Sequence, residues 1–152
     1  MKYLLLTIAA ATIVSCAGTP PSNLGASDGD LAPCPDSPNC VSSQSSEADT
    51  VHYIEPFGYS TDRETAASIL VNVLEQTPRI TVVSAETNYV LAEARTKIMR
   101  FVDDLEFYFD PAEPVIHLRS ASRLGYGDLG ENRKRIEMLR ELFYSALSET
   151  DS

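Results

Sequence analysis

The sequence predicts a two-layer α+β domain, in which an antiparallel meander sheet of about four or five strands packs one face against two helices. Two observations carry this prediction. Between residues 79 and 119, runs with apolar side chains at every second position follow one another with short links, as sequential antiparallel strands do. On both sides of these runs, apolar residues recur at three- and four-residue spacing, as they do in amphipathic helices.

Turn residues separate the expected strands. We expect strands at residues 51–55, 79–85, 89–98 and 103–110, and a further strand that begins at Val115. Glu86-Thr87-Asn88 supplies a tight turn, whereas Pro111 and Pro114 break the chain before the last strand. Because side chains alternate along a strand, one side of the sheet collects apolar residues and the other collects charged ones. We expect the charged side to be either a solvated face or a contact surface.

Two helices flank these strands, and each has a start signal. Thr61 and Glu64 have the spacing of a capping box, and the helix that follows should end before Pro78. The second helix should begin near Asp128, which has an acidic residue three positions later. Asn132 falls on the apolar stripe of this helix, so we expect its amide to be buried and to tie the preceding turn.

Residues 1–15 have the features of a signal peptide, with a positive charge at Lys2 and an apolar run too short to span a bilayer permanently. The run Ile13-Val14-Ser15-Cys16 resembles a lipobox, so we expect Cys16 to be lipidated and to hold the chain at a membrane. An ordinary secretory signal, with Cys16 incidental, is the alternative. Residues 16–50 are rich in Ser, Pro and Gly and should be a tether, and residues 51–150 should form a single domain.

Cys34 and Cys40 lie six positions apart in this tether. Outside the cytoplasm such a pair is expected to form a disulfide. A metal site would need more ligands than His52 and His117 supply, and a redox pair usually has two residues between its cysteines. We therefore expect a structural disulfide, no metal and no cofactor.

The charge balance excludes one class of partner. Acidic side chains outnumber basic ones 22 to 12, which gives a net charge of -10. A chain this acidic is repelled by phosphate backbones, so we expect no binding to nucleic acid.

The densest polar run surrounds the start of the second helix. The side chains expected to bind a ligand there are Arg119, Ser120, Ser122, Arg123, Tyr126 and Arg133. The residues expected to form the turn and helix cap are Gly125, Gly127, Asp128 and Asn132. Cations in the first turns of a helix are disfavoured by its dipole, so they need either neighbouring acids or a bound anion. Both explanations remain open from the sequence.

Two segments carry a resemblance to a known family. The runs CPDSPNCVSS at residues 34–43 and RSASRLGYGDLGENRKR at residues 119–135 resemble the signature segments of the family catalogued as domain of unknown function 1499, which occurs in bacteria and in plastid-bearing organisms. The resemblance covers about residues 34–147. It implies a grouping in which no activity is established, and so supplies no mechanism.

No catalytic arrangement is recognisable in the sequence, because strand alternation puts His117 on the face opposite Ser120 and Ser122.

Taken together, these features predict a lipid-anchored protein of the bacterial cell envelope that faces the periplasm. We expect a non-enzymatic binding or assembly module whose partner is an envelope protein or a small anionic ligand. The alternative is an enzyme of unrecognised type that uses the polar cluster between Arg119 and Arg133.

Overall fold

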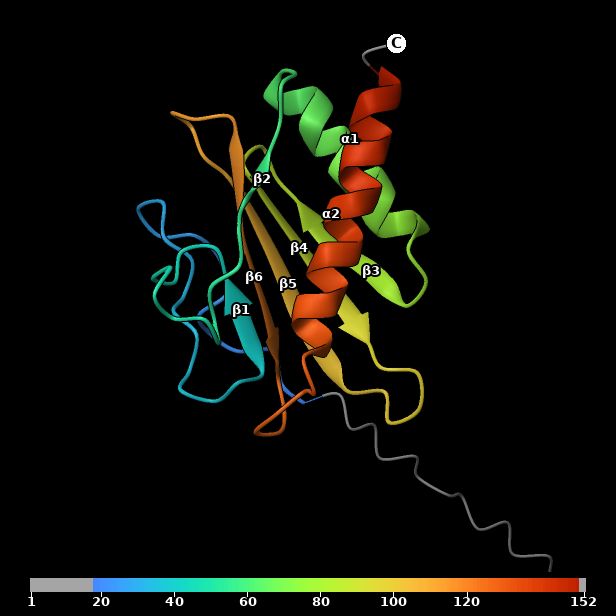
Figure 1. Ribbon diagram of the computed structural model, residues 1–152. Helices are drawn as coiled ribbons and strands as arrows, with labels where there is room; N and C mark the ends of the chain where they lie inside the picture. The colour runs from blue at the N-terminus through green and yellow to red at the C-terminus, as the bar shows by residue number, and fades with distance from the viewer. Residues whose placement is uncertain (1–17, 151–152) are drawn as a thin grey trace, which may run out of the picture.

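The computed structural model describes residues 18–150, so the expected signal peptide and the lipidation site Cys16 lie outside the described residues. The chain forms one six-stranded sheet with two helices on one face (Figure 1). In chain order the elements are β1 (Cys40–Ser42), β2 (Phe57–Gly58), α1 (Arg63–Gln76), β3 (Ile80–Ala85), β4 (Tyr89–Arg95), β5 (Val102–Phe109), β6 (Val115–Ser122) and α2 (Glu131–Thr150). The strand order is β1-β6-β5-β4-β3, and β2 also pairs with β6. The predicted α+β class is confirmed.

The core lies between the sheet and the helices. β3 to β6 form the expected antiparallel meander, in which each strand pairs with the next along the chain. Side chains at every second position of these strands face the helices and are buried. The sheet contributes Val90, Ala92, Ala94, Leu105, Phe107, Phe109, Ile116 and Leu118, and the helices contribute Ala66, Leu70, Val73, Leu74, Ile136, Leu139, Phe143 and Leu147.

The start of α1 lies one residue later than the capping box predicted. Asp62, not Thr61, is the N-cap, and its Oδ1 accepts the Thr65 N–H at 2.8 Å. This hydrogen bond is the main cause of a lowered pKa at the Asp62 carboxyl. A carboxylate is both a good cap and a favourable charge at the positive end of the helix dipole, so Asp62 takes the position.

Residues 51–55, expected to be a strand, begin as a turn at Val51 and His52, and Tyr53 makes a single parallel bridge with Ser42. The Asp49 carboxylate accepts the N–H groups of Val51 and His52, each at 3.2 Å. The backbone oxygen of Asp49 also accepts the Tyr53 N–H at 2.8 Å. An Asp side chain that bonds the backbone ahead of it competes with strand pairing, so pairing in this segment is limited to the Tyr53 bridge, and the next strand, β2, starts at Phe57.

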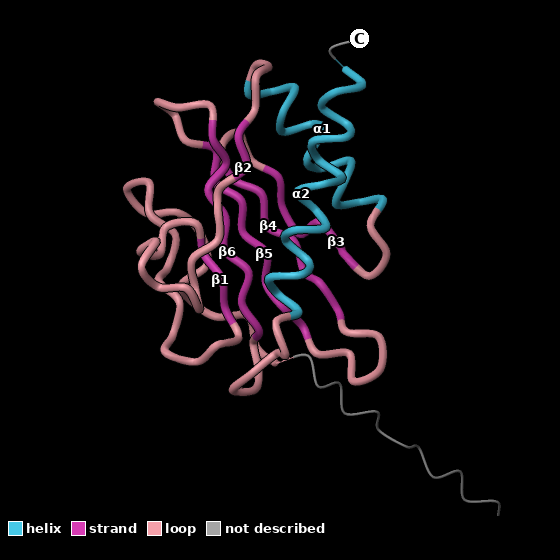
Figure 2. The backbone as a smooth tube through the Cα atoms, viewed as in Figure 1, coloured by secondary structure: helices cyan, strands magenta, loops and turns pink. Residues whose placement is uncertain are grey.

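The charged face of the sheet is covered, which corrects the expectation of a solvated face. Residues 18–39, here called the N-terminal arm, run across it, and β1 joins the sheet edge by pairing with β6. Figure 2 shows these loops gathered on the side of the sheet away from the helices. The disulfide between Cys34 and Cys40 is confirmed, with 5.6 Å between the Cα atoms.

The tether expected for residues 16–50 is therefore wrong for the described part of that range. Leu31 and Val41 are buried, and the Gly25 N–H donates to the buried Glu106 carboxylate at 2.9 Å. The composition wrongly predicted a tether, because the arm is held largely through contacts with polar side chains of the sheet. A pattern of apolar residues does not reveal such contacts.

Candidate functional site

The sheet separates four of the predicted ligand residues, of which three lie on β6 and Arg123 directly follows it. Arg119 and Arg123 point to the face that the N-terminal arm covers. Ser120 and Ser122 point to the other face, where both hydrogen-bond the side chain of Asn132 on α2. These residues cannot contact one ligand, because alternate residues of a strand project from opposite faces.

The other two predicted ligand residues lie apart from both groups. Tyr126 is 77% exposed in the turn between β6 and α2. Arg133, on α2, donates to the backbone oxygens of Val51 and Tyr53 at 3.0 Å and 2.7 Å, so it fastens the turn that precedes β2. The structure does not bring the six predicted residues together in one site.

Arg119 belongs to a closed set of ion pairs beneath the arm. Its Nη1 donates to Glu106 Oε2 at 3.0 Å, and the Glu106 side chain is fully buried. Glu106 also accepts the Tyr89 hydroxyl at 2.8 Å. Burial, together with the charge of Glu106, raises the pKa of Tyr89 far above its ordinary value. The carboxylate is thus satisfied by partners from the arm, β4 and β6.

Arg123 completes this set, here called the sealed arginine layer, which consists of Arg119, Arg123, Glu93, Asp104 and Glu106. Its guanidinium donates twice to Asp104, at 2.6 Å and 2.9 Å, and once to Glu93 at 2.6 Å. The hydrogen bonds to Asp104 are the main cause of a raised pKa at Arg123. Two arginines therefore face three carboxylates, with one further cation, Arg95, at 2.8 Å from Glu93.

A cavity of about 400 Å³ lies between the arm and this layer. Arg119 Nε is buried there, and no described residue accepts a hydrogen bond from it. Both arginines are nevertheless neutralised by carboxylates, so the cavity presents no unpaired positive charge to an anion.

Asn132 lies buried at the start of α2. It is 1% exposed, and its Nδ2 donates to Asn39 O and Ser122 Oγ, each at 3.0 Å, and to Asp128 Oδ2 at 2.8 Å. The amide therefore ties the start of α2 both to the backbone before β1 and to the Asp128 side chain of the preceding turn. Asn39 also holds that turn, through its Nδ2 and the Gly125 oxygen at 2.7 Å.

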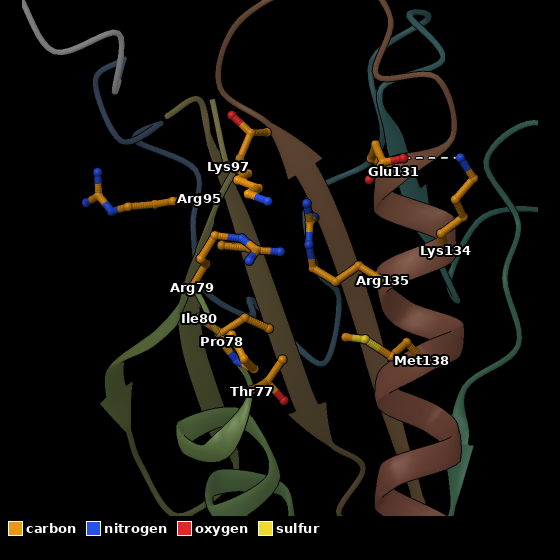
Figure 3. Close-up of a pocket in the computed structure, with 12 residues that line it drawn as sticks. Thr77, Pro78, Arg79, Ile80, Arg95, Lys97, Glu131, Lys134, Arg135 and Met138 are labelled. Carbon is orange, nitrogen blue, oxygen red and sulfur yellow. Dashed lines mark hydrogen bonds and ion pairs between the residues drawn. The ribbon is translucent and has the colours of Figure 1, made fainter. Parts of the chain in front are cut away.

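A second cavity, here called the cationic cavity, has the opposite electrostatics. It measures about 290 Å³ and lies between the connection from α1 to β3, the end of β4 and the first turns of α2 (Figure 3). Five of the chain's 12 basic residues line it: Arg79, Arg95, Lys97, Lys134 and Arg135. Among the described residues that line it, Glu131 is the one acid. The chain as a whole has a net charge of -10, so the excess of cations at this cavity is opposite in sign to the overall charge.

Two of these cations are unpaired. Lys134 pairs with Glu131 at 3.1 Å and Arg135 pairs with Asp103 at 2.6 Å. By contrast, the side chains of Arg79 and Lys97 make no hydrogen bond or ion pair with any described residue. In Figure 3 the ends of Arg79, Lys97 and Arg135 extend into the space between β4 and α2, whereas Lys134 turns toward Glu131.

The backbone at Arg79 is strained. Its φ is 67°, in the left-handed region that disfavours side chains by roughly 1–2 kcal/mol. Pro78 precedes Arg79. The backbone oxygen of Arg79 accepts the Arg95 N–H at 2.9 Å, so the pairing of β3 with β4 holds Arg79 in place. A glycine would fit this position at lower conformational cost, yet the chain carries an arginine there.

Arg79 and Lys97 are not among the site residues that the sequence predicts. They lie just outside the observed β3 and β4, at the ends of the strands that were expected at residues 79–85 and 89–98. Antiparallel pairing brings these ends together, and α2 returns beside them. Whether an acid lies beside these two cations depends on the fold, so no local sequence motif could have predicted that they are unpaired.

A serine, a histidine and an aspartate meet elsewhere, at the start of β6. His117 Nδ1 lies 3.3 Å from Ser43 Oγ, and its Nε2 lies 3.8 Å from Asp110 Oδ2. Ser43 is 8% exposed, and its Oγ accepts the Leu118 N–H at 2.9 Å. The hydroxyl therefore extends the pairing of β1 with β6, and it is too enclosed to attack a substrate.

One comparison places the chain among known proteins. The model of a family described as "Protein of unknown function (DUF1499)" matches residues 30–143, which include the last part of the arm and every residue that lines the cationic cavity. No curated protein matches the chain. Within residues 18–150, neither helix is long and apolar enough to cross a membrane. The same residues hold no cluster of His, Cys, Asp and Glu suited to a metal ion.

Proposed function

We propose that this chain, which belongs to the DUF1499 family of proteins of unknown function, is a lipid-anchored, non-enzymatic binding module of the bacterial cell envelope whose cationic cavity holds a small anionic group. Phosphate, sulfate and carboxylate groups share the chemistry that this cavity recognises.

The observation that carries the binding role is the pair of unpaired cations, Arg79 and Lys97, in a cavity of about 290 Å³. Cations held close together repel one another, and an anion between them removes that repulsion and supplies charge-assisted hydrogen bonds. Apolar side chains, including Ile80 and Met138, line the rest of the cavity. A ligand with both a charged group and an apolar part therefore suits the cavity best.

The lack of an unpaired carboxylate among the described lining residues favours binding over catalysis. Glu131 is the one carboxylate among the described lining residues, and it is paired with Lys134. A general acid or base needs access to the reacting atoms, and a nucleophile needs an activating neighbour.

The anchoring role is supported from the N-terminal side. The run that ends at Cys16 resembles a lipobox. The disulfide between Cys34 and Cys40 suits an oxidising compartment such as the periplasm. Lipidation would then hold the module at the membrane surface, where an envelope component with an anionic group is within reach.

Thermal melts of the full mature chain with inorganic phosphate test the binding role. A ligand at one hundred times its dissociation constant should stabilise the wild type by roughly 2.7 kcal/mol. Lys97→Gln should reduce this stabilisation strongly. Arg100→Gln, the same kind of change three residues later but outside the cavity lining, should leave it intact. No stabilisation of the wild type by phosphate, sulfate or acetate, or equal losses in the two variants, would overturn the anion site.

Metabolic labelling with a fatty acid tests the anchoring role. The wild-type chain should incorporate label and float with membranes, and Cys16→Ser should do neither. An unlabelled wild-type chain would show that the N-terminal segment is an ordinary secretory signal.

A further inference from the structure

The chain enters the described part of the molecule at one end of the sheet. A Cβ built on Gly18 would lie 3.0 Å from Arg123 Cβ and 3.2 Å from Leu124 Cγ, so Gly18 packs on the turn that follows β6. Cys16 is two residues earlier, and two residues of chain span at most about 7 Å. If Cys16 carries lipid, this end of the domain lies against the bilayer with almost no free tether.

Two loops form this end, here called the anchor end. They are residues 96–101, between β4 and β5, and residues 123–130, between β6 and α2. Arg123 N–H donates to Val102 O at 3.1 Å, which joins the two loops where the strands meet. In Figure 1 both loops lie at the lower end of the sheet, and the orange loop, residues 123–130, lies beside the first described residues in blue.

Large apolar side chains are exposed on both loops. They are Ile98, Met99, Leu124, Tyr126 and Leu129, with exposed fractions of 85%, 56%, 46%, 77% and 93%. These are five of the ten large apolar side chains that are exposed in residues 18–150. Their concentration on two neighbouring loops distinguishes them from apolar residues scattered singly over a surface.

Leu129 gives the strongest indication that these side chains form a contact surface. It is the most exposed of the set, and its φ is 57°, in the left-handed region. Glycine or asparagine is the usual residue in that conformation, and a polar side chain is the usual residue at that exposure. A leucine is disfavoured on both grounds in water, and strained residues of this kind concentrate at contact sites.

The charges of the loops differ between the two ends of the sheet. Lys97 and Arg100 flank Ile98 and Met99, and residues 96–101 contain no acid. The second loop, residues 123–130, holds one acid, Asp128, whose carboxylate accepts hydrogen bonds from Gly130 and Asn132. The loops at the opposite end carry acids instead, with Glu86 between β3 and β4, and Asp110 and Glu113 between β5 and β6. A chain of net charge -10 is repelled by an anionic membrane overall, but the anchor end presents cations to phospholipid phosphates.

We propose that the anchor end docks onto the bilayer, with Ile98, Met99, Tyr126 and Leu129 entering the boundary between headgroups and acyl chains. Lys97 and Arg100 contact the phosphates of anionic phospholipids. The proposal rests on the lipid anchor at Cys16, which brings this end within reach of the membrane. Docking fixes the orientation of the domain, so that the cationic cavity, to which Lys97 also contributes, lies close to the headgroups.

Tryptophan quenching in vesicles tests the docking, because the chain contains no native Trp. Lipidated full mature chains with Leu129→Trp or Leu142→Trp are reconstituted into vesicles of phosphatidylethanolamine and phosphatidylglycerol brominated in their acyl chains. Leu142 is 44% exposed on α2, eleven residues after the helix start, or roughly 16 Å along its axis. The Leu129→Trp chain should lose most of its emission, whereas the Leu142→Trp chain should keep it.

Flotation with the vesicles separates docking from anchoring. A Leu129→Trp chain that floats but is not quenched overturns docking and leaves the anchor intact. A chain that does not float overturns both. As a test of charge, adding Lys97→Gln and Arg100→Gln to the Leu129→Trp chain should reduce quenching several-fold. Equal quenching with and without these two cations would overturn the phosphate contacts.

Discussion

The sealed arginine layer and the cationic cavity hold the same kind of side chain in opposite surroundings. In the layer, Arg119 and Arg123 are buried beneath the arm, and every charge has an opposite charge at hydrogen-bond distance. In the cavity, Arg79 and Lys97 are exposed, and their side chains form no ion pair with any described acid. The difference teaches that the partner, not the residue type, decides whether an arginine holds a fold together or remains available to a ligand.

The two regions should therefore respond oppositely to mutation. Removing a cation from the sealed arginine layer should lower stability and leave phosphate binding unchanged. Removing a cation from the cavity should lower phosphate binding and leave stability unchanged. A variant that moves both quantities together would break the comparison.

Arg119→Met should have the largest effect. The substitution keeps much of the side-chain volume but leaves Glu106 buried without its cation, which should destabilise the fold by roughly 3–5 kcal/mol. Arg95→Met is the matched control, because Arg95 pairs with Glu93 at 2.8 Å but is 36% exposed. Its loss should cost under about 1 kcal/mol. Urea denaturation of both variants measures the two values, and equal values would mean that burial of the ion pair does not matter.

Arg123→Gln should follow, with a loss of about 2–3 kcal/mol, because three charge-assisted hydrogen bonds to Asp104 and Glu93 disappear. The stabilisation that phosphate confers should remain the same as in the wild type, which separates this arginine from the predicted anion contacts. A smaller phosphate effect in this variant would return Arg123 to the ligand site.

Asn132→Ala should cost roughly 1–3 kcal/mol, because it leaves the buried Ser120 hydroxyl without its acceptor and removes the side-chain hydrogen bond to the Asn39 oxygen. Asn72→Ala is the control, since the Asn72 amide bonds only Gln76 among the described residues, on the exposed face of α1. That change should stay within about 0.5 kcal/mol. Two equal losses would assign the effect to the loss of an amide from a helix, not to the buried network.

The fold was predictable because its signals are local. Alternation along residues 79–119 gave the meander, and a polar residue on an apolar stripe gave the buried Asn132. The covered second face was not predictable in the same way. Its contacts join residues about eighty positions apart, as Gly25 and Glu106 do.

The candidate site could not be predicted from the sequence, for a related reason. Arg119 and Arg123 stand in a conspicuous polar run, but their acids come from β4 and β5, and the run itself does not show them. Arg79 and Lys97 stand in no run at all, and they meet only because strand pairing aligns the ends of β3 and β4. A count of unpaired cations requires the three-dimensional partners, which no spacing rule supplies.

Arg79→Gly should have the smallest effect on stability and a clear effect on binding. Glycine adopts the φ of 67° without the side-chain penalty, although it gains freedom in the unfolded chain, so stability should be unchanged or raised by up to about 1 kcal/mol. Phosphate should stabilise the variant much less than the wild type, because one of the two unpaired cations is gone. Leu129→Gly is the matched control, since it relieves a φ of 57° without removing a cation, and its response to phosphate should equal that of the wild type.

If Arg79→Gly instead destabilises the fold by more than about 1 kcal/mol, the side chain makes a structural contact and belongs with the sealed arginines. If it leaves both stability and phosphate binding unchanged, the strain at Arg79 serves neither purpose, and Lys97 alone would have to account for the anion.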